Sequence, residues 1–207
     1  TANAAVKKLV AEMKPAAAPA PPQSTAKHPA PAATPVALPP LVAELEQEVH
    51  RLIEAGKNNR LRFRAMNDLA VWLVCPRHRE LLVPLGKRQI DLGGFATESD
   101  SLETLFEQLG YTSDRRFNAF YGNRRLHFSD PKRETNVDIF LDNLEMYHRL
   151  DLVPFLTQEE FLLPVTALLL ARLQLVEMSD TGLRDLGALV LEHDLSVGEE
   201  KGKIDAA

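Results

Sequence analysis

Two short apolar stretches of this chain each carry an acidic residue. The first is Gln89-Ile90-Asp91-Leu92 and the second is Asn136-Val137-Asp138-Ile139-Phe140. Alternate residues of a strand point to the same face, so each stretch predicts a strand that directs one carboxylate at one face of a sheet. Carboxylate oxygens are preferred ligands of Mg²⁺. The two stretches therefore predict that Asp91 and Asp138 share a divalent metal site on neighbouring strands.

Both acids have a structural alternative. Acidic residues on strands also face water at a sheet edge or pair with nearby arginines, and such pairs need no metal. The two residues alone do not separate the alternatives, and the metal interpretation depends on the elements around them.

A segment rich in proline and alanine divides the chain. Residues 15–40 contain nine Pro and nine Ala. Proline lacks a backbone N–H and favours the polyproline II conformation, so we expect an extended linker that reaches on the order of 80 Å at about 3.1 Å per residue. The compact domain is then predicted at residues 41–195, followed by a flexible tail at residues 196–207.

Residues 1–14 predict an amphipathic helix, because four apolar residues recur at helical spacing: Val6, Leu9, Val10 and Met13. A helix of about three turns is marginal alone in water and needs a surface to lie on. One hypothesis is a docking helix that binds a groove on a protein partner. The alternative is a terminus that folds back onto its own domain or has no role.

Within residues 41–195 the apolar spacing changes between helical and strand periods. The first helix is expected to end at Ala55-Gly56 with the glycine in a left-handed cap. We expect further helices at residues 69–74, 99–109 and 164–193 (the last interrupted near Ser179), and strands at 61–66, 89–95, 117–121, 125–128 and 136–141. This order predicts an α+β (α/β) domain, with a mixed sheet flanked by helices and a helical C-terminal part.

The composition limits the classes of partner that this chain is expected to bind. A net charge of −5 and a pI near 5.7 provide no general attraction to nucleic acid or to anionic membranes. Cys75 is the single cysteine, so no internal disulfide can form and a cytoplasmic location is expected. The apolar run at residues 164–170 is far too short to span a bilayer, so no membrane partner is predicted.

One basic run leaves nucleotide or nucleic acid open as a partner. It comprises Arg115, Arg116, Arg124, Arg125, His127, Lys132 and Arg133. Such a run can attract a nucleotide or an RNA end, but the acidity of the whole chain favours a solvated face. The aromatic residues among these basic ones are predicted to be core: Phe117, Phe120, Tyr121 and Phe128.

Taken in order, several motifs resemble the nucleotidyltransferase fold of the DNA polymerase beta superfamily. More narrowly, they are similar to bacterial minimal nucleotidyltransferases, including those of abortive-infection toxin systems. The motifs lie at residues 64–73, 89–92, 109–111, 114–119, 136–140, 168–174 and 183–186, so the resemblance covers residues 57–195. It implies Mg²⁺-dependent transfer of a nucleoside monophosphate from a triphosphate to a hydroxyl group.

The chain departs from this family pattern where the triphosphate would bind. The family has a Gly-Gly or Gly-Ser turn whose backbone N–H groups approach phosphate, and the matching residues here are Asn67 and Asp68. Asp68 adds a negative charge, which would repel a phosphate charge 4 Å away by roughly 4 kcal/mol at an effective dielectric of about 20. A role for Asp68 as a metal ligand is the alternative. Arg172 stands where the family often carries a phosphate-binding lysine.

A second departure affects the metal site. The family holds two Mg²⁺ ions with an Asp-x-Asp pair and a third Asp, and the matching residues here are Gln89, Asp91 and Asp138. A neutral glutamine is a poor Mg²⁺ ligand, so only weak binding of one ion at Asp91 and Asp138 is expected.

Two functions remain open from the sequence. The favoured one is a nucleotidyltransferase-like domain with weak or absent catalysis, which acts as a binding or scaffold subunit tethered to a larger assembly by its N-terminal helix. The alternative is an active Mg²⁺-dependent nucleotidyltransferase that modifies an RNA, a protein or a small molecule, with Asp91 and Asp138 as its catalytic residues.

Overall fold

The computed structural model describes residues 36–157, 160–174, 179–198 and 202–205. The compact unit that holds them begins at Thr34. No helix within these ranges combines the length and the apolar character needed to cross a membrane. Outside the described residues lie the predicted linker up to residue 35 and the predicted docking helix at residues 1–14, with its apolar residues Val6, Leu9, Val10 and Met13.

A five-stranded mixed sheet forms the centre of this unit, with the strand order β1-β2-β5-β4-β3. β2 and β5 are parallel neighbours in the middle, and the other neighbouring pairs are antiparallel. A parallel pair needs a crossover connection, which residues 95–134 supply. The strands are β1 (Phe63–Met66), β2 (Gln89–Gly94), β3 (Thr112–Ser113), β4 (Arg125–Asp130) and β5 (Thr135–Leu141).

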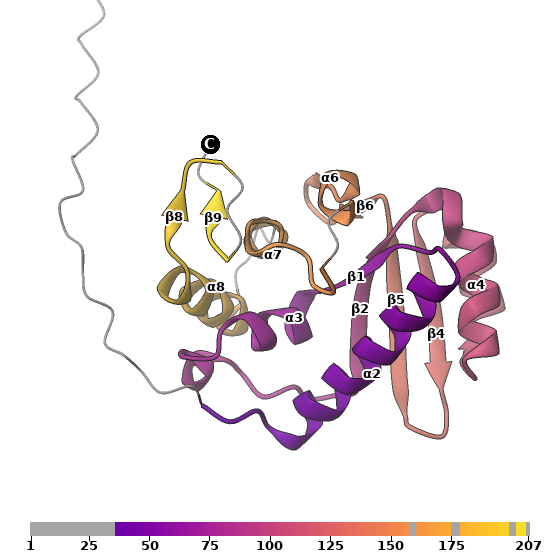
Figure 1. Cartoon of the computed structure of the whole chain (residues 1–207), viewed down its shortest axis with the longest axis horizontal. Coiled ribbons are helices and arrows are strands. Elements are labelled where there is room, and N and C mark those ends of the chain that lie inside the picture. Colours follow the sequence, from indigo (N-terminus) through magenta and orange to yellow (C-terminus); the bar gives the residue numbers. More distant parts are fainter. Residues whose placement is uncertain (1–35, 158–159, 175–178, 199–201, 206–207) are drawn as a thin grey trace, which may run out of the picture. The chain divides into compact units, whose positions relative to one another are not determined.

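Two helices cover one face of the sheet: α2 (Pro40–Asn58) and α4 (Ser99–Gln108). Figure 1 shows α2 running across the strands. Alternation along the central strands turns Ile90 and Ile139 towards these helices, where they join Leu52 in the main hydrophobic core. The same alternation turns the acidic residues of β2 and β5 to the opposite face.

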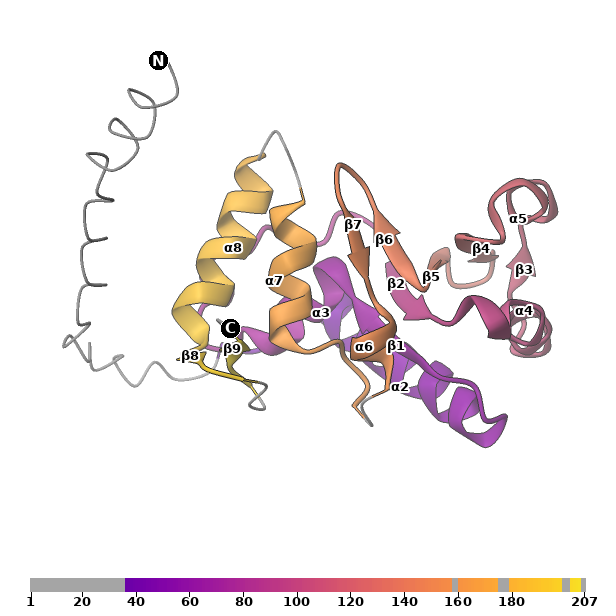
Figure 2. The same ribbon diagram turned by 90° about the horizontal axis from the view of Figure 1, so that it is seen from above.

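The helices of the C-terminal part are α6 (Val153–Leu156), α7 (Val165–Leu173) and α8 (Asp180–Glu192). Of these, α7 and α8 pack against α3 (Asn67–Val74), which follows β1 directly, and α6 packs against β2. Figure 2 shows α7 and α8 side by side, with α4 and α5 (Arg115–Tyr121) at the other end of the sheet. A second hydrophobic cluster joins Met66, Leu156 and Leu168. The predicted helical break is confirmed, because the Ser179 hydroxyl accepts a hydrogen bond from the Gly182 N–H at the start of α8.

Shorter elements complete the described part of the chain. Two 3₁₀ turns occur at Arg79–Leu81 and Ala96–Glu98. Two small two-stranded sheets are formed by β6 (Asn143–Glu145) with β7 (Arg149–Asp151), and by β8 (Leu195–Ser196) with β9 (Ile204–Asp205). The predicted α+β class, with a mixed sheet flanked by helices and a helical C-terminal part, is confirmed.

The predicted left-handed helix end at Gly56 is wrong. α2 continues to Asn58, and the residue with positive φ in this turn is Arg60. A Cβ atom built on Gly56 would lie 2.5 Å from the ring of Phe63. Close packing against that ring, rather than backbone conformation, therefore requires a glycine here.

The predicted strand at residues 117–121 is also wrong. Residues 115–121 form α5, because the Asp114 carboxylate caps the helix by accepting a hydrogen bond from the Phe117 N–H at 2.9 Å. β4 pairs instead with β3 and β5. In this arrangement Phe128 is buried as predicted, whereas Phe120 and Tyr121 are exposed and are not core residues.

The described residues of the predicted flexible tail at 196–207, which are 196–198 and 202–205, include residues of two short strands. Ser196 lies in β8 and pairs with Asp205 of β9. The neighbouring residue Ile204 is buried and belongs to the main hydrophobic core. Burial of this one apolar side chain gives residues 204–205 a defined place against the domain.

Candidate functional site

Asp91 and Asp138 are direct neighbours in the sheet. Asp91 on β2 is opposite Asp138 on β5 in the parallel register, so both side chains emerge on the same face. The prediction that the two strands bring these carboxylates together is confirmed by this register. Asp138 is buried, and Asp91 is partly buried.

Gln89 joins the two carboxylates. It precedes Asp91 by two residues on β2, so its side chain lies on the same face. The Nε2 amide donates one hydrogen bond to Asp91 Oδ1 and another to Asp138 Oδ2, each at 2.9 Å. A neutral N–H donor therefore lies between two oxygens that a bridging cation would otherwise bind.

Two basic residues of β4 complete the surroundings of Asp138. Arg125 Nη2 lies 2.5 Å from Oδ2, and His127 Nδ1 lies 2.7 Å from Oδ1. The register of β4 and β5 places His127 directly opposite Asp138. The arginine alternative considered for these acids thus applies to Asp138. Sequence reasoning assigned both basic residues to a solvated face, although their spacing of two on a strand indicates a shared face.

Asn67 supplies the remaining contact of Asp91. It begins α3 directly after β1, with a positive φ of 57°, a conformation that asparagine tolerates better than most residues. Met66 pairs with Asp91 across the two strands, which brings the Asn67 side chain close enough for Nδ2 to donate to Asp91 Oδ2 at 2.9 Å. At the turn between β1 and α3, the Asn67 side chain therefore faces the carboxylate pair.

The electrostatics of Asp91 follow from this enclosure. Burial raises the pKa of Asp91 above its ordinary value, and the negative charge of Asp138 adds to the effect. The hydrogen bonds from Asn67 and Gln89 lower the pKa but do not cancel the rise. Asp91 is held by neutral amides, whereas Asp138 has the cationic Arg125 beside it.

These residues do not fit a two-metal site. Each of the four carboxylate oxygens of Asp91 and Asp138 already contacts a nitrogen of a neighbouring side chain. Mg²⁺ requires oxygen ligands in near-octahedral geometry, and the residue between the carboxylates presents an amide N–H instead. Within the described ranges, no group of three or more His, Cys, Asp or Glu side chains is arranged to hold a metal ion.

Asp68 and Arg172 lie in a second charged cluster with Asp185. Arg172 on α7 forms ion pairs with Asp68 on α3 and with Asp185 on α8, the latter at 3.2 Å. The Asp68 side chain is 60% exposed, whereas the Asp185 side chain is 8% exposed. Burial raises the pKa of Asp185 to about 6, opposed by Arg172 and assisted by Asp68. The arginine expected to bind phosphate is thus held by two carboxylates.

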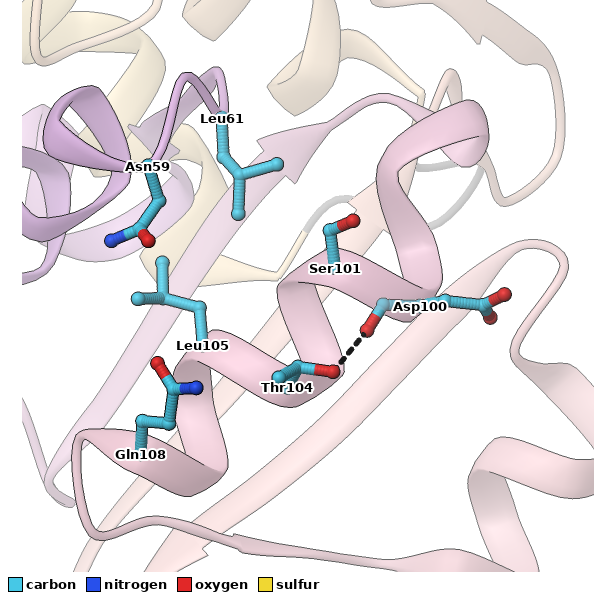
Figure 3. Close-up of a pocket in the computed structure, with 7 residues that line it drawn as sticks. All are labelled: Asn59, Leu61, Asp100, Ser101, Thr104, Leu105 and Gln108. Carbon is cyan, nitrogen blue, oxygen red and sulfur yellow. Dashed lines mark hydrogen bonds between the residues drawn. The ribbon is translucent and has the colours of Figure 1, made fainter.

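Three hollows on the described part of the surface lie away from the carboxylate pair. One lies between the end of α2 and α4, where the residues in Figure 3 surround it. Its lining is mostly neutral, and Thr104 Oγ1 donates a hydrogen bond to the backbone oxygen of Asp100. Asp100 is the only titratable residue in that lining, so this hollow offers no acid–base pair.

Comparison with known proteins reveals similarity only in the path of the chain. No family model matches the sequence, and no curated protein sequence matches it. The lincomycin-bound crystal structure of the lincosamide antibiotic adenylyltransferase LnuA is similar with a TM-score of 0.49 and 12% identity, over 70% of this chain and 95% of that one.

Two structures of the antibiotic-resistance factor ANT(2'')-Ia are also similar. The solution structure has a TM-score of 0.45 and 13% identity, over 72% of this chain and 82% of that one. The crystal structure in complex with adenylyl-2''-tobramycin has a TM-score of 0.44 and 10% identity, over 71% and 87%. At these values the function of this chain has to be argued from its own side chains.

Proposed function

We propose that this chain is a nucleotidyltransferase-like protein in which a hydrogen-bonded cluster has replaced the metal site, so that it acts by binding rather than by nucleotidyl transfer. The observation that supports the proposal is the amide of Gln89, which donates to both Asp91 and Asp138. The order of the sequence motifs supports the family, and the contacts of Gln89 argue against metal-dependent catalysis.

Charge makes the cluster a poor place for a dication. Arg125 lies 2.5 Å from Asp138. A Mg²⁺ ion placed about 4 Å from this guanidinium would be repelled by roughly 8 kcal/mol at an effective dielectric of about 20. An entering ion would also have to displace the Gln89 amide from both carboxylates. Arg125 and Gln89 together satisfy the charge and the hydrogen bonding that a metal would supply.

The second charged cluster agrees with weakened binding of a triphosphate. Asp68 places an exposed carboxylate at the turn after β1, beside the arginine that would have to reach phosphate. A phosphate group would compete with Asp68 and Asp185 for Arg172. The proposal therefore includes weak binding of nucleoside triphosphates at this turn.

The direct test is to restore the carboxylate. Gln89→Asp removes the bridging donor and places a third acid beside Asp91 and Asp138. We expect the wild-type protein to show no saturable Mn²⁺ binding in isothermal titration calorimetry, and the variant to gain it. Gln108→Asp adds an acid at an exposed site on α4 and serves as the matched control, which should not gain binding.

An activity assay tests the alternative function, that of an active nucleotidyltransferase. The wild-type protein is incubated with labelled nucleoside triphosphates, Mg²⁺ or Mn²⁺, and tRNA or whole-cell protein as acceptor. We expect no label transfer. Transfer that disappears in Asp91→Ala would contradict the proposal and establish the alternative, an active nucleotidyltransferase.

The binding role is proposed to involve the N-terminal segment. The apolar residues Val6, Leu9, Val10 and Met13 would dock on a protein partner, with residues 15–35 as the tether. Affinity capture from lysate should lose that partner when residues 1–14 are deleted. Capture that is unchanged by the deletion would contradict the docking role without affecting the conclusion about the metal site.

A further inference from the structure

The surface of α5 presents two aromatic side chains to solvent. Phe120 is 74% exposed and Tyr121 is 56% exposed. They line a shallow hollow of about 470 Å³ together with Asp114, Arg116 and Phe117. Large exposed aromatic side chains that adjoin a cation are uncommon on a solvated face and often mark an interaction site.

One of the two exposed rings, that of Tyr121, packs against Phe117, which in turn contacts β4. The Phe117 ring lies 4.9 Å from the Tyr121 ring and 5.9 Å from the His127 ring. The Arg125 guanidinium lies 5.7 Å from the Phe117 ring and 4.8 Å from the ring of Phe140 on β5. Contacts with His127 and Arg125 of β4 therefore hold Phe117, and through it Tyr121, against the sheet.

Positive charge accompanies the rings. Within the described part of the chain, Arg116 forms no ion pair, and it is exposed. Arg124 pairs at 3.1 Å with Glu145, but both side chains are more than half exposed, and such pairs contribute little. Asp114 in the same hollow accepts a hydrogen bond from the Phe117 N–H. The hollow thus offers at least one unpaired cation beside two exposed rings, in a chain of net charge −5.

The other side of α5 has the opposite character. A neighbouring hollow is lined by Asp100, Glu103 and Glu107 together with Arg115. These acids would repel phosphate, so a polyanion is confined to the side of α5 that carries Arg116, Phe120 and Tyr121. The acidic hollow therefore marks the edge beyond which a polyanion would be repelled.

We propose that the surface formed by Arg116, Phe120, Tyr121 and Arg124 binds single-stranded nucleic acid. Exposed rings provide stacking platforms for unpaired bases, and arginines contact the phosphates between them. An acidic peptide would use the arginines but would not need the rings, and an apolar protein surface would not need the arginines. The proposal does not depend on whether the carboxylate pair binds metal.

Fluorescence anisotropy with a short labelled single-stranded RNA tests the proposal on the full-length protein. The double variant Phe120→Ala/Tyr121→Ala should bind at least about ten-fold more weakly, because loss of base stacking has effects of this order. Both residues are exposed, so the fold should persist, which circular dichroism checks. Tyr147→Ala, an exposed aromatic residue between β6 and β7, is the matched control and should bind as the wild type does.

The contribution of the arginines to RNA binding is measured separately. Arg116→Ala should weaken binding and reduce the slope of log affinity against log salt concentration by about one. Arg184→Ala on α8, also exposed, should leave the slope unchanged. Absence of RNA binding by the wild type, an equal loss in Tyr147→Ala, or equal competition by inorganic polyphosphate and by unlabelled RNA would each overturn the proposal.

Discussion

Gln89 presents a hydrogen-bond donor to the carboxylate pair, where an aspartate at the same position would present only acceptors. An aspartate at this position would add a third negative charge, whereas the glutamine amide donates to Asp91 and Asp138. The pair is then stabilised by hydrogen bonds within the protein. One side chain therefore decides whether this face of the sheet attracts a cation or already contains its own donors.

The stability of the cluster depends on Asp138. In Asp138→Ala, Arg125 and His127 lose this acceptor and the Gln89 amide loses one of its two carboxylate partners, and we expect the free energy of unfolding to fall by about 2 kcal/mol. This value is below that of a fully buried pair because the Arg125 side chain is 40% exposed. Urea denaturation measures the difference.

Glu145→Ala is the matched control for this experiment. It removes a carboxylate from an exposed arginine pair, that with Arg124, and should cost less than about 1 kcal/mol. Equal effects of the Asp138 and Glu145 substitutions would show that the cluster contributes nothing beyond an ordinary surface contact.

At the scale of elements, Asp185 couples the packing of three helices to pH. It lies on α8 and contacts Arg172 of α7, which also pairs with Asp68 of α3. The pKa of Asp185 is about 6 in the folded protein, above its ordinary value of 3.8. The folded state therefore holds this proton more tightly than the unfolded state, and the contribution of Asp185 to stability decreases as pH rises between those two values.

Asp185→Asn should remove this part of the pH dependence. At about 1.36 kcal/mol per pKa unit, the contribution of Asp185 between pH 3.8 and 6 is on the order of 3 kcal/mol. The free energy of unfolding of the variant, minus that of the wild type, should therefore increase as pH rises across that range. Glu107→Gln, which removes an exposed carboxylate on α4, should retain the wild-type slope.

Two glycines in helices should respond oppositely to alanine. Gly56→Ala in α2 places a Cβ 2.5 Å from the Phe63 ring, so the packing of α2 on β1 must shift, and we expect a loss of about 2 kcal/mol. Gly187→Ala in α8 has open space around the new methyl group and should gain about 0.5–1 kcal/mol from helix propensity. Thermal unfolding of both variants tests this, and a tolerated Gly56→Ala would contradict the packing argument.

At the scale of the molecule, the compact unit should fold without residues 1–33. Both hydrophobic clusters are formed by residues of the unit that begins at Thr34. A chain of residues 34–207 should therefore unfold in one cooperative transition with the midpoint of the full-length protein. A broad or strongly lowered transition would contradict this domain boundary.

Much of the domain could be predicted because its signals are local. The alternation of Ile90 and Leu92 with Gln89 and Asp91 predicts a strand with one apolar face, and the structure confirms it. The expectation for residues 117–121 failed because the signal that forms α5 is the capping carboxylate of Asp114. The expectation of a flexible tail failed for another reason, since Ile204 pairs with Leu195 in a small sheet and is buried in the main hydrophobic core, which no local pattern indicates.

The sequence by itself determined the strands of Asp91 and Asp138, and it identified Gln89 as an unusual residue beside them. It could not determine what Gln89 does, because its contact with Asp138 depends on the register between β2 and β5. The approach of Arg125 to Asp138 depends likewise on the pairing of β4 with β5. Hydrogen bonds and ion pairs between residues distant in the chain form only when strands align, so tertiary structure alone decided that these carboxylates are enclosed by donors.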